Sequence, residues 1–232
     1  MTRLDSVNDF TPTGPLDDRA ITDPMNDRTA SDTADGDAHP KDGEFFRKIA
    51  RLVELTATPA DSRVSFLDSG DRAELRRITV RRPIHLPPAF WKVVCTSGIN
   101  VHSDDESELA WGAIVNGIAL TADDCLDARY DRKNNFGHAL AIVADDATDR
   151  RFDALLSASR DRYPTLLGHI LRYAASKKIS FNWTDLAHLT LAKEARRNTP
   201  RSSVETYVNT LARSYYTTRV RLEHSTIHKE GA

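Results

Sequence analysis

The chain has 232 residues, a net charge of −2 and 40% hydrophobic residues, a composition typical of one large folded domain or two small ones. Its two cysteines have no paired Cys or Cys/His spacing, which excludes a disulfide scaffold and a cysteine-held cofactor and favours a reducing compartment. The most apolar run, 109–120, is shorter than the roughly 18 residues of a membrane span, and the polar first residues do not resemble a signal peptide. We therefore predict a cytoplasmic protein.

Charge divides the chain into a tail and a body. Residues 1–43 carry ten Asp and four Lys or Arg, with few large apolar side chains. Such a segment cannot bury enough apolar surface to offset roughly 1–2 kcal/mol of backbone entropy per ordered residue, so we predict a disordered acidic tail. The body is expected to divide into an N-terminal helical region over 44–146 and a C-terminal helical bundle over 147–232.

The first half of the body shows helical periodicity. One apolar stripe follows Gly43 and indicates a helix there: Phe45, Ile49, Leu52 and Val53. Capping residues favour further short helices over 68–77 and 88–94. The segment 109–120 is apolar on nearly every side, so its helix is expected in the middle of the fold.

The second half continues this pattern. Helices are expected at about 135–144, 150–159, 163–176, 183–193 and 200–222. The last of them has an apolar stripe with helical spacing: Val204, Tyr207, Val208, Leu211 and Tyr215. We therefore predict an all-α fold, a helical bundle in two parts that follows the tail.

Few residue patterns suggest catalysis. The chain has no phosphate-binding GxxxxGK[ST] or GxGxxG loop, and His224 with His228 lacks the carboxylates that usually complete a metal site. Asp123, Asp124 and Asp127 leave a magnesium-dependent enzyme open as an alternative, although no second acidic helix accompanies them. We predict a protein without catalytic residues, metal or cofactor.

Aromatic and cysteine side chains are assigned to the core. Their apolar neighbours make packing a better explanation than base stacking or thiol chemistry. This prediction covers six residues: Phe90, Trp91, Cys95, Trp111, Cys125 and Trp183.

Arginine on helices is the remaining functional signal. Five arginines lie within 72–82 beside a single acid, and residues 150–221 carry 14 basic and 5 acidic side chains. Guanidinium groups match phosphate oxygens in bidentate geometry, and weakly opposed charges add their fields. No helix-turn-helix, homeodomain or zinc-finger pattern is evident, so we expect backbone contact without base reading. A free-standing DNA-binding regulator stays open as an alternative.

Five segments in this order resemble the CasB family: 70–77 (GDRAELRR), 86–91 (LPPAFW), 136–141 (FGHALA), 151–156 (RFDALL) and 181–183 (FNW). CasB proteins are the small subunits of the type I-E CRISPR Cascade complex. The resemblance extends over roughly 44–222.

The resemblance implies an all-helical, non-catalytic subunit. Two copies would lie head to tail along Cascade, beside its backbone subunits and its large subunit. The implied nucleic-acid partners are CRISPR RNA, target DNA and the displaced non-target strand. Basic surfaces would stabilise the R-loop, in agreement with guide-directed recognition, where base pairing reads the sequence and protein holds the strands.

The resemblance also carries over nine basic residues as candidate nucleic-acid contacts: Arg76, Arg77, Arg132, Lys133, Arg160, Arg172, Arg196, Arg197 and Arg201. The first two match the family's basic pair in its first motif. For Arg160 and Arg172, surface ion pairs with neighbouring aspartates remain an alternative: Asp153, Asp161 and Asp185. His138 occupies a position where arginine is commoner in the family.

Overall fold

The computed structural model describes residues 40–57, 65–81, 84–121, 134–194 and 201–230. In the first and last of these segments, side chains are described for 43–56 and 203–225. Residues 1–39 of the predicted acidic tail lie outside the described residues, whereas its last four residues, 40–43, form the start of the first helix.

The described residues fold into helices joined by short connections, which confirms the all-α prediction. In chain order the helices are α1 (Pro40–Ala57), α2 (Ser69–Arg76), α3 (Pro88–Thr96), α4 (Asp105–Thr121), α5 (Phe136–Val143), α6 (Asp146–Leu156), α7 (Tyr163–Ser176), α8 (Thr184–Glu194) and α9 (Arg201–Glu230). The largest differences from the prediction are at two helix ends. The helix expected from 150 begins at Asp146, and the last helix continues to Glu230, well beyond 222.

Short polar side chains determine where several helices begin. Asp68 accepts a hydrogen bond from the backbone of Asp71, and Asn135 does the same for His138 at the start of α5. Asp145 accepts hydrogen bonds from the hydroxyl and the backbone N–H of Thr148, which lower the pKa of its carboxyl and start α6 earlier than the periodicity indicates.

Helix α4 lies in the middle of the fold, as predicted. It packs against α1, α2, α7 and α8, and residues 109–119 are buried along its length. Its polar interruption, Asn116, is also buried, and its amide nitrogen lies 2.9 Å from the carbonyl oxygen of Leu75 and 3.1 Å from that of Arg76. Asn116 therefore donates to carbonyl groups in the last turn of α2.

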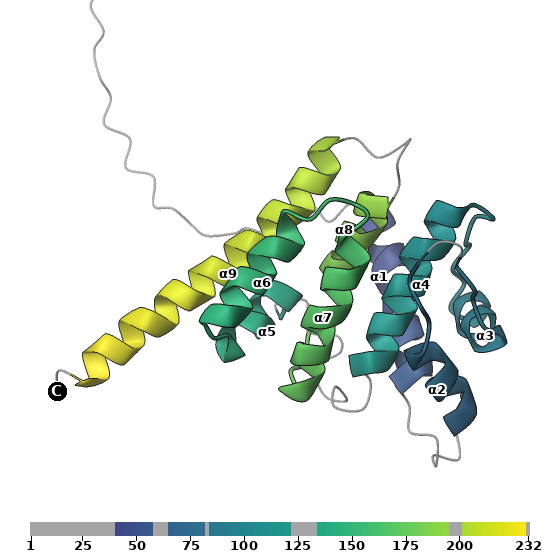
Figure 1. Cartoon of the computed structure of the whole chain (residues 1–232), viewed down its shortest axis with the longest axis horizontal. Coiled ribbons are helices and arrows are strands. Elements are labelled where there is room, and N and C mark those ends of the chain that lie inside the picture. Colours follow the sequence, from purple (N-terminus) through teal and green to yellow (C-terminus); the bar gives the residue numbers. More distant parts are fainter. Residues whose placement is uncertain (1–39, 58–64, 82–83, 122–133, 195–200, 231–232) are drawn as a thin grey trace, which may run out of the picture. The chain divides into compact units, whose positions relative to one another are not determined.

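Helix α9 packs along α5 in a close backbone approach (Figure 1). Gly137 makes this approach possible, because a Cβ at that position would overlap the carbonyl oxygen of Leu211. The apolar stripe of α9 faces inward as predicted, with Leu211 and Tyr215 fully buried. The opposite face of α9 is consequently left to polar side chains.

A polar network attaches α9 to α6. Tyr215 donates a hydrogen bond to Asp149, and Tyr216 donates one to Asp153. Arg219 also pairs with Asp149 at 3.2 Å. Burial is the main cause that raises the pKa of both tyrosines, and the neighbouring carboxylates raise it further. The pKa of Tyr216 is raised to about 12. Asp149 and Asp153 of α6 thus hold the last helix.

Helices on both sides of residue 146 pack together, since α4 contacts α7 and α8, and α5 contacts α9. The division into parts at 146 stays a prediction.

None of the described helices is long and apolar enough to cross a bilayer.

The core assignments are mostly confirmed. Phe90, Trp111 and Trp183 are buried. Trp91 and Cys95 are exposed, so their assignment to the core was wrong; both lie on the outward side of the short helix α3. Cys125 lies outside the described residues.

Candidate nucleic-acid interface

The arginine cluster predicted at 72–82 does not present all its charges to solvent. Arg72 is buried and lies 3.2 Å from the hydroxyl of Ser65, and Arg76 donates through Nε to the carbonyl oxygen of Ala119 at 3.0 Å. Arg77 and Arg81 are exposed. The predicted pair therefore combines a partly buried Arg76, attached to α4, with an exposed Arg77 at the end of α2.

Arg160 has a structural role in the described chain. Its guanidinium lies 3.0 Å from Glu106 on α4 and 3.1 Å from Glu194 on α8, and only 15% of its side chain is exposed. Burial opposes the charge, but hydrogen bonds to both carboxylates outweigh burial and raise the pKa of Arg160. The sequence alternative of a surface pair with a neighbouring aspartate was wrong, because the partners come from distant helices. We leave Arg160 out of the proposed interface.

Arg172 is exposed on α7. Arg201 is the first residue of α9, and its side chain is not described. The other predicted contacts lie outside the described residues: Arg132, Lys133, Arg196 and Arg197. The structure therefore does not bring the nine predicted residues into one described surface.

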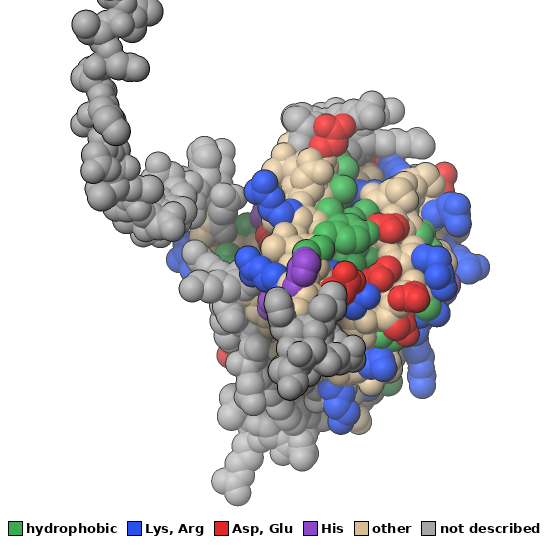
Figure 2. Space-filling model, turned by 90° about the vertical axis from the view of Figure 1, so that its left-hand side faces the viewer, with side chains coloured by type: hydrophobic (Ala, Val, Ile, Leu, Met, Phe, Trp, Pro, Cys, Tyr) green, Lys and Arg blue, Asp and Glu red, His purple; other side chains and the backbone are tan. Residues whose placement is uncertain are grey.

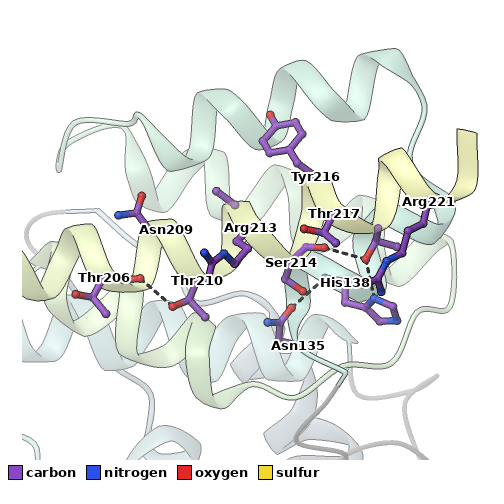
Figure 3. A pocket seen from close by; sticks show the side chains of 12 residues that line it. Asn135, His138, Thr206, Asn209, Thr210, Arg213, Ser214, Tyr216, Thr217 and Arg221 are labelled. Carbon is purple, nitrogen blue, oxygen red and sulfur yellow. Dashed lines mark hydrogen bonds between the residues drawn. The ribbon is translucent and has the colours of Figure 1, made fainter. Parts of the chain in front are cut away.

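A groove that the sequence reasoning missed runs along α9 beside the start of α5 (Figure 3). Its volume is about 1030 Å³. His138 of α5 and Asn135, which caps this helix, contribute to the lining. The remaining lining residues are on α9: Thr206, Asn209, Thr210, Ala212, Arg213, Ser214, Tyr216, Thr217, Thr218 and Arg221. Among the described lining residues there are two arginines and no carboxylate.

Helical spacing explains how α9 supplies this lining. Thr206, Thr210, Arg213, Thr217 and Arg221 follow one another at intervals of three or four, so they share the face opposite Leu211 and Tyr215. The same periodicity in the sequence could have identified this face. The search for segments dense in arginine did not identify this face, because the two arginines of the groove are eight residues apart in the sequence.

Charge is mixed on the neighbouring surface. Figure 2, seen from the side on which α9 ends in Figure 1, shows basic, acidic and hydrophobic side chains close together. Ile142 and Val220 are among the exposed large hydrophobics, at 56% and 51%. The carboxylate-free lining of the groove thus differs from the mixed charge of the face shown in Figure 2.

The residues considered as alternative metal sites are not described by the structure as metal sites. Asp123, Asp124 and Asp127 lie outside the described residues, as does the side chain of His228. Within the described part of the chain, no group of three His, Cys, Asp or Glu side chains is placed to hold a metal ion.

Fold and groove together define an all-helical protein with a long helix that carries a polar, cationic face. The chain belongs to the family of the CRISPR-associated protein Cse2, whose model matches residues 71–216. This is the CasB family that the sequence motifs resemble, the small subunit of type I-E Cascade.

A solved structure has a similar fold. It is a chain in the crystal structure of E. coli Cascade bound to a PAM-containing dsDNA target, with 19% sequence identity and a TM-score of 0.50. The match covers 73% of this chain and 95% of that chain. No curated protein matches the sequence significantly.

Proposed function

We propose that this chain is a non-catalytic Cascade subunit that binds nucleic-acid backbones without reading sequence and thereby stabilises the R-loop. Its partners would be CRISPR RNA, target DNA, the displaced non-target strand, the backbone and large subunits of Cascade, and a second copy of itself. Family membership and the similarity to a chain of a DNA-bound Cascade support this proposal.

The observation that carries the proposal is the lining of the α5–α9 groove. Guanidinium, hydroxyl and amide groups are those that contact phosphate and sugar in nucleic-acid complexes. Arg213 and Arg221 supply charge, and no described lining residue opposes them with a carboxylate. A single strand, whose phosphates are accessible from one side, fits such a groove on a helix surface.

Several predicted contacts remain part of this proposal. Exposed Arg77 and Arg172 are proposed to touch strands outside the groove. Arg132, Lys133, Arg196, Arg197 and Arg201 are proposed contacts whose side chains the structure does not describe.

Binding measurements on the full chain test the proposal. Fluorescence anisotropy would compare two unrelated single-stranded DNA sequences, a single-stranded RNA and a random duplex over a series of salt concentrations. We expect affinities for the two DNA sequences within about threefold, and a log–log salt slope of about −0.7 for each phosphate contacted.

Two results would reject the proposal. One is the absence of salt-dependent binding to any strand. The other is a preference of about 10³-fold or more for one duplex sequence, which is the signature of a sequence-reading regulator.

A further inference from the structure

His138 lies in the groove beside the side chain of Arg221 (Figure 3). It is half-buried on the first turn of α5, where its backbone N–H donates to the side chain of Asn135 at 3.0 Å. Its ring nitrogen Nδ1 lies 2.8 Å from the hydroxyl oxygen of Thr218 on α9. These contacts fix both the backbone and the ring of His138 relative to the groove.

The hydrogen bonds of Thr218 favour one imidazole tautomer. The hydroxyl oxygen of Thr218 lies 2.8 Å from the carbonyl oxygen of Ser214, which can only accept. A hydroxyl has one proton to donate, so with that proton on the bond to Ser214 the oxygen of Thr218 accepts from His138, and this arrangement corresponds to the tautomer with a proton on Nδ1. In the neutral ring, Nε2 is then an acceptor with no hydrogen-bond partner among the described residues.

A nucleic-acid phosphate distinguishes the two protonation states of this ring. Phosphate oxygens only accept hydrogen bonds. In neutral His138 the Nε2 atom is also an acceptor, so it cannot form a hydrogen bond with a phosphate. A second proton, on Nε2, turns the ring into a cationic donor without disturbing its bond to Thr218. Arg221, alongside, offers donors to the same phosphate.

We propose that the α5–α9 groove binds a strand phosphate between Arg221 and His138, and that His138 takes up a proton when the strand binds. This inference rests on the proposed function, since it assigns a phosphate site and its regulation to the same groove.

The charged groups around His138 favour this coupling. Arg213 and Arg221 line the groove from α9 and carry fixed positive charge. From α8, Asp185 hydrogen-bonds to Asn135, and burial raises the pKa of the Asp185 carboxyl. A bound phosphate places negative charge beside His138 and favours the cationic ring. By linkage, strand affinity must then rise as the pH falls.

The test measures affinity of the full chain for a random-sequence single-stranded DNA between pH 5.5 and 8.5 at constant salt. We expect affinity to fall about tenfold from pH 6 to pH 8. His138→Asn keeps a donor for Thr218 but cannot titrate, so its affinity should be low and nearly independent of pH. His138→Arg, a permanent cation, should bind tightly over the whole range.

Calorimetry in buffers of different ionisation enthalpy counts the protons taken up on binding. The unmodified chain should take up about half a proton more per strand near pH 7 than His138→Asn, the mean uptake that a tenfold change over two pH units requires. Equal proton uptake and equal pH dependence in the two proteins would overturn the inference while leaving strand binding intact. Failure of the unmodified chain and of His138→Arg to bind at any pH would instead reject the proposed function and the inference together. Matching thermal unfolding shows that the variants are folded.

Discussion

Replacing Arg160 by alanine is expected to lower the free energy of unfolding by about 3–5 kcal/mol, because two carboxylates lose the cation that balances them. Glu194 is 1% exposed and cannot regain water in the folded chain. The same guanidinium joins α4 to α8, which are far apart in sequence. Thermal unfolding should occur about 6–20 °C lower than in the unmodified chain.

Arg172→Ala is the matched control, since it removes an exposed guanidinium from α7. Its effect on unfolding should stay within about 0.5 kcal/mol. Glu106→Gln, which alters only the more exposed carboxylate, should fall between the two variants. If Arg160→Ala unfolded at the same temperature as Arg172→Ala, the buried ion pair would not contribute to stability.

Charge reversal in the groove is expected to have the largest effect on binding. Arg213→Glu combined with Arg221→Glu places two carboxylates where the described lining has none. Loss of about 1.4 kcal/mol per contact would weaken single-strand affinity by about 100-fold. The log–log salt slope should become shallower by about 1.4, the amount for two phosphate contacts.

Arg150→Glu combined with Arg162→Glu makes the same change in net charge at exposed positions that do not line the groove. This control separates local contact from long-range charge, because both double variants lower the overall field equally. Equal losses of affinity in the two variants would show that the groove has no special role.

Most of the fold could be predicted from the sequence because apolar periodicity and capping are local signals. The stripe through Leu211 and Tyr215 predicted the buried face of α9, and the apolar sides of α4 predicted its central place. The start of α6 was predicted too late in the chain. The prediction followed the apolar periodicity, whereas the helix begins at its cap, Asp145.

The site could be predicted only in part, because it depends on contacts between distant segments. No local pattern indicated that Arg160 would meet Glu106 and Glu194. His138 and Thr218 are 80 residues apart in the sequence and meet only because α5 packs on α9, so the sequence alone did not indicate the groove.

Photo-crosslinking tests the central claim most directly. Single-stranded DNA containing 5-bromouracil would be irradiated with the full chain, and the linked peptides would be identified by mass spectrometry. The groove offers two reactive rings to such a strand, His138 and Tyr216. We predict that the main crosslinks fall within 135–138 and 206–221; crosslinks confined to other parts of the chain would contradict the account.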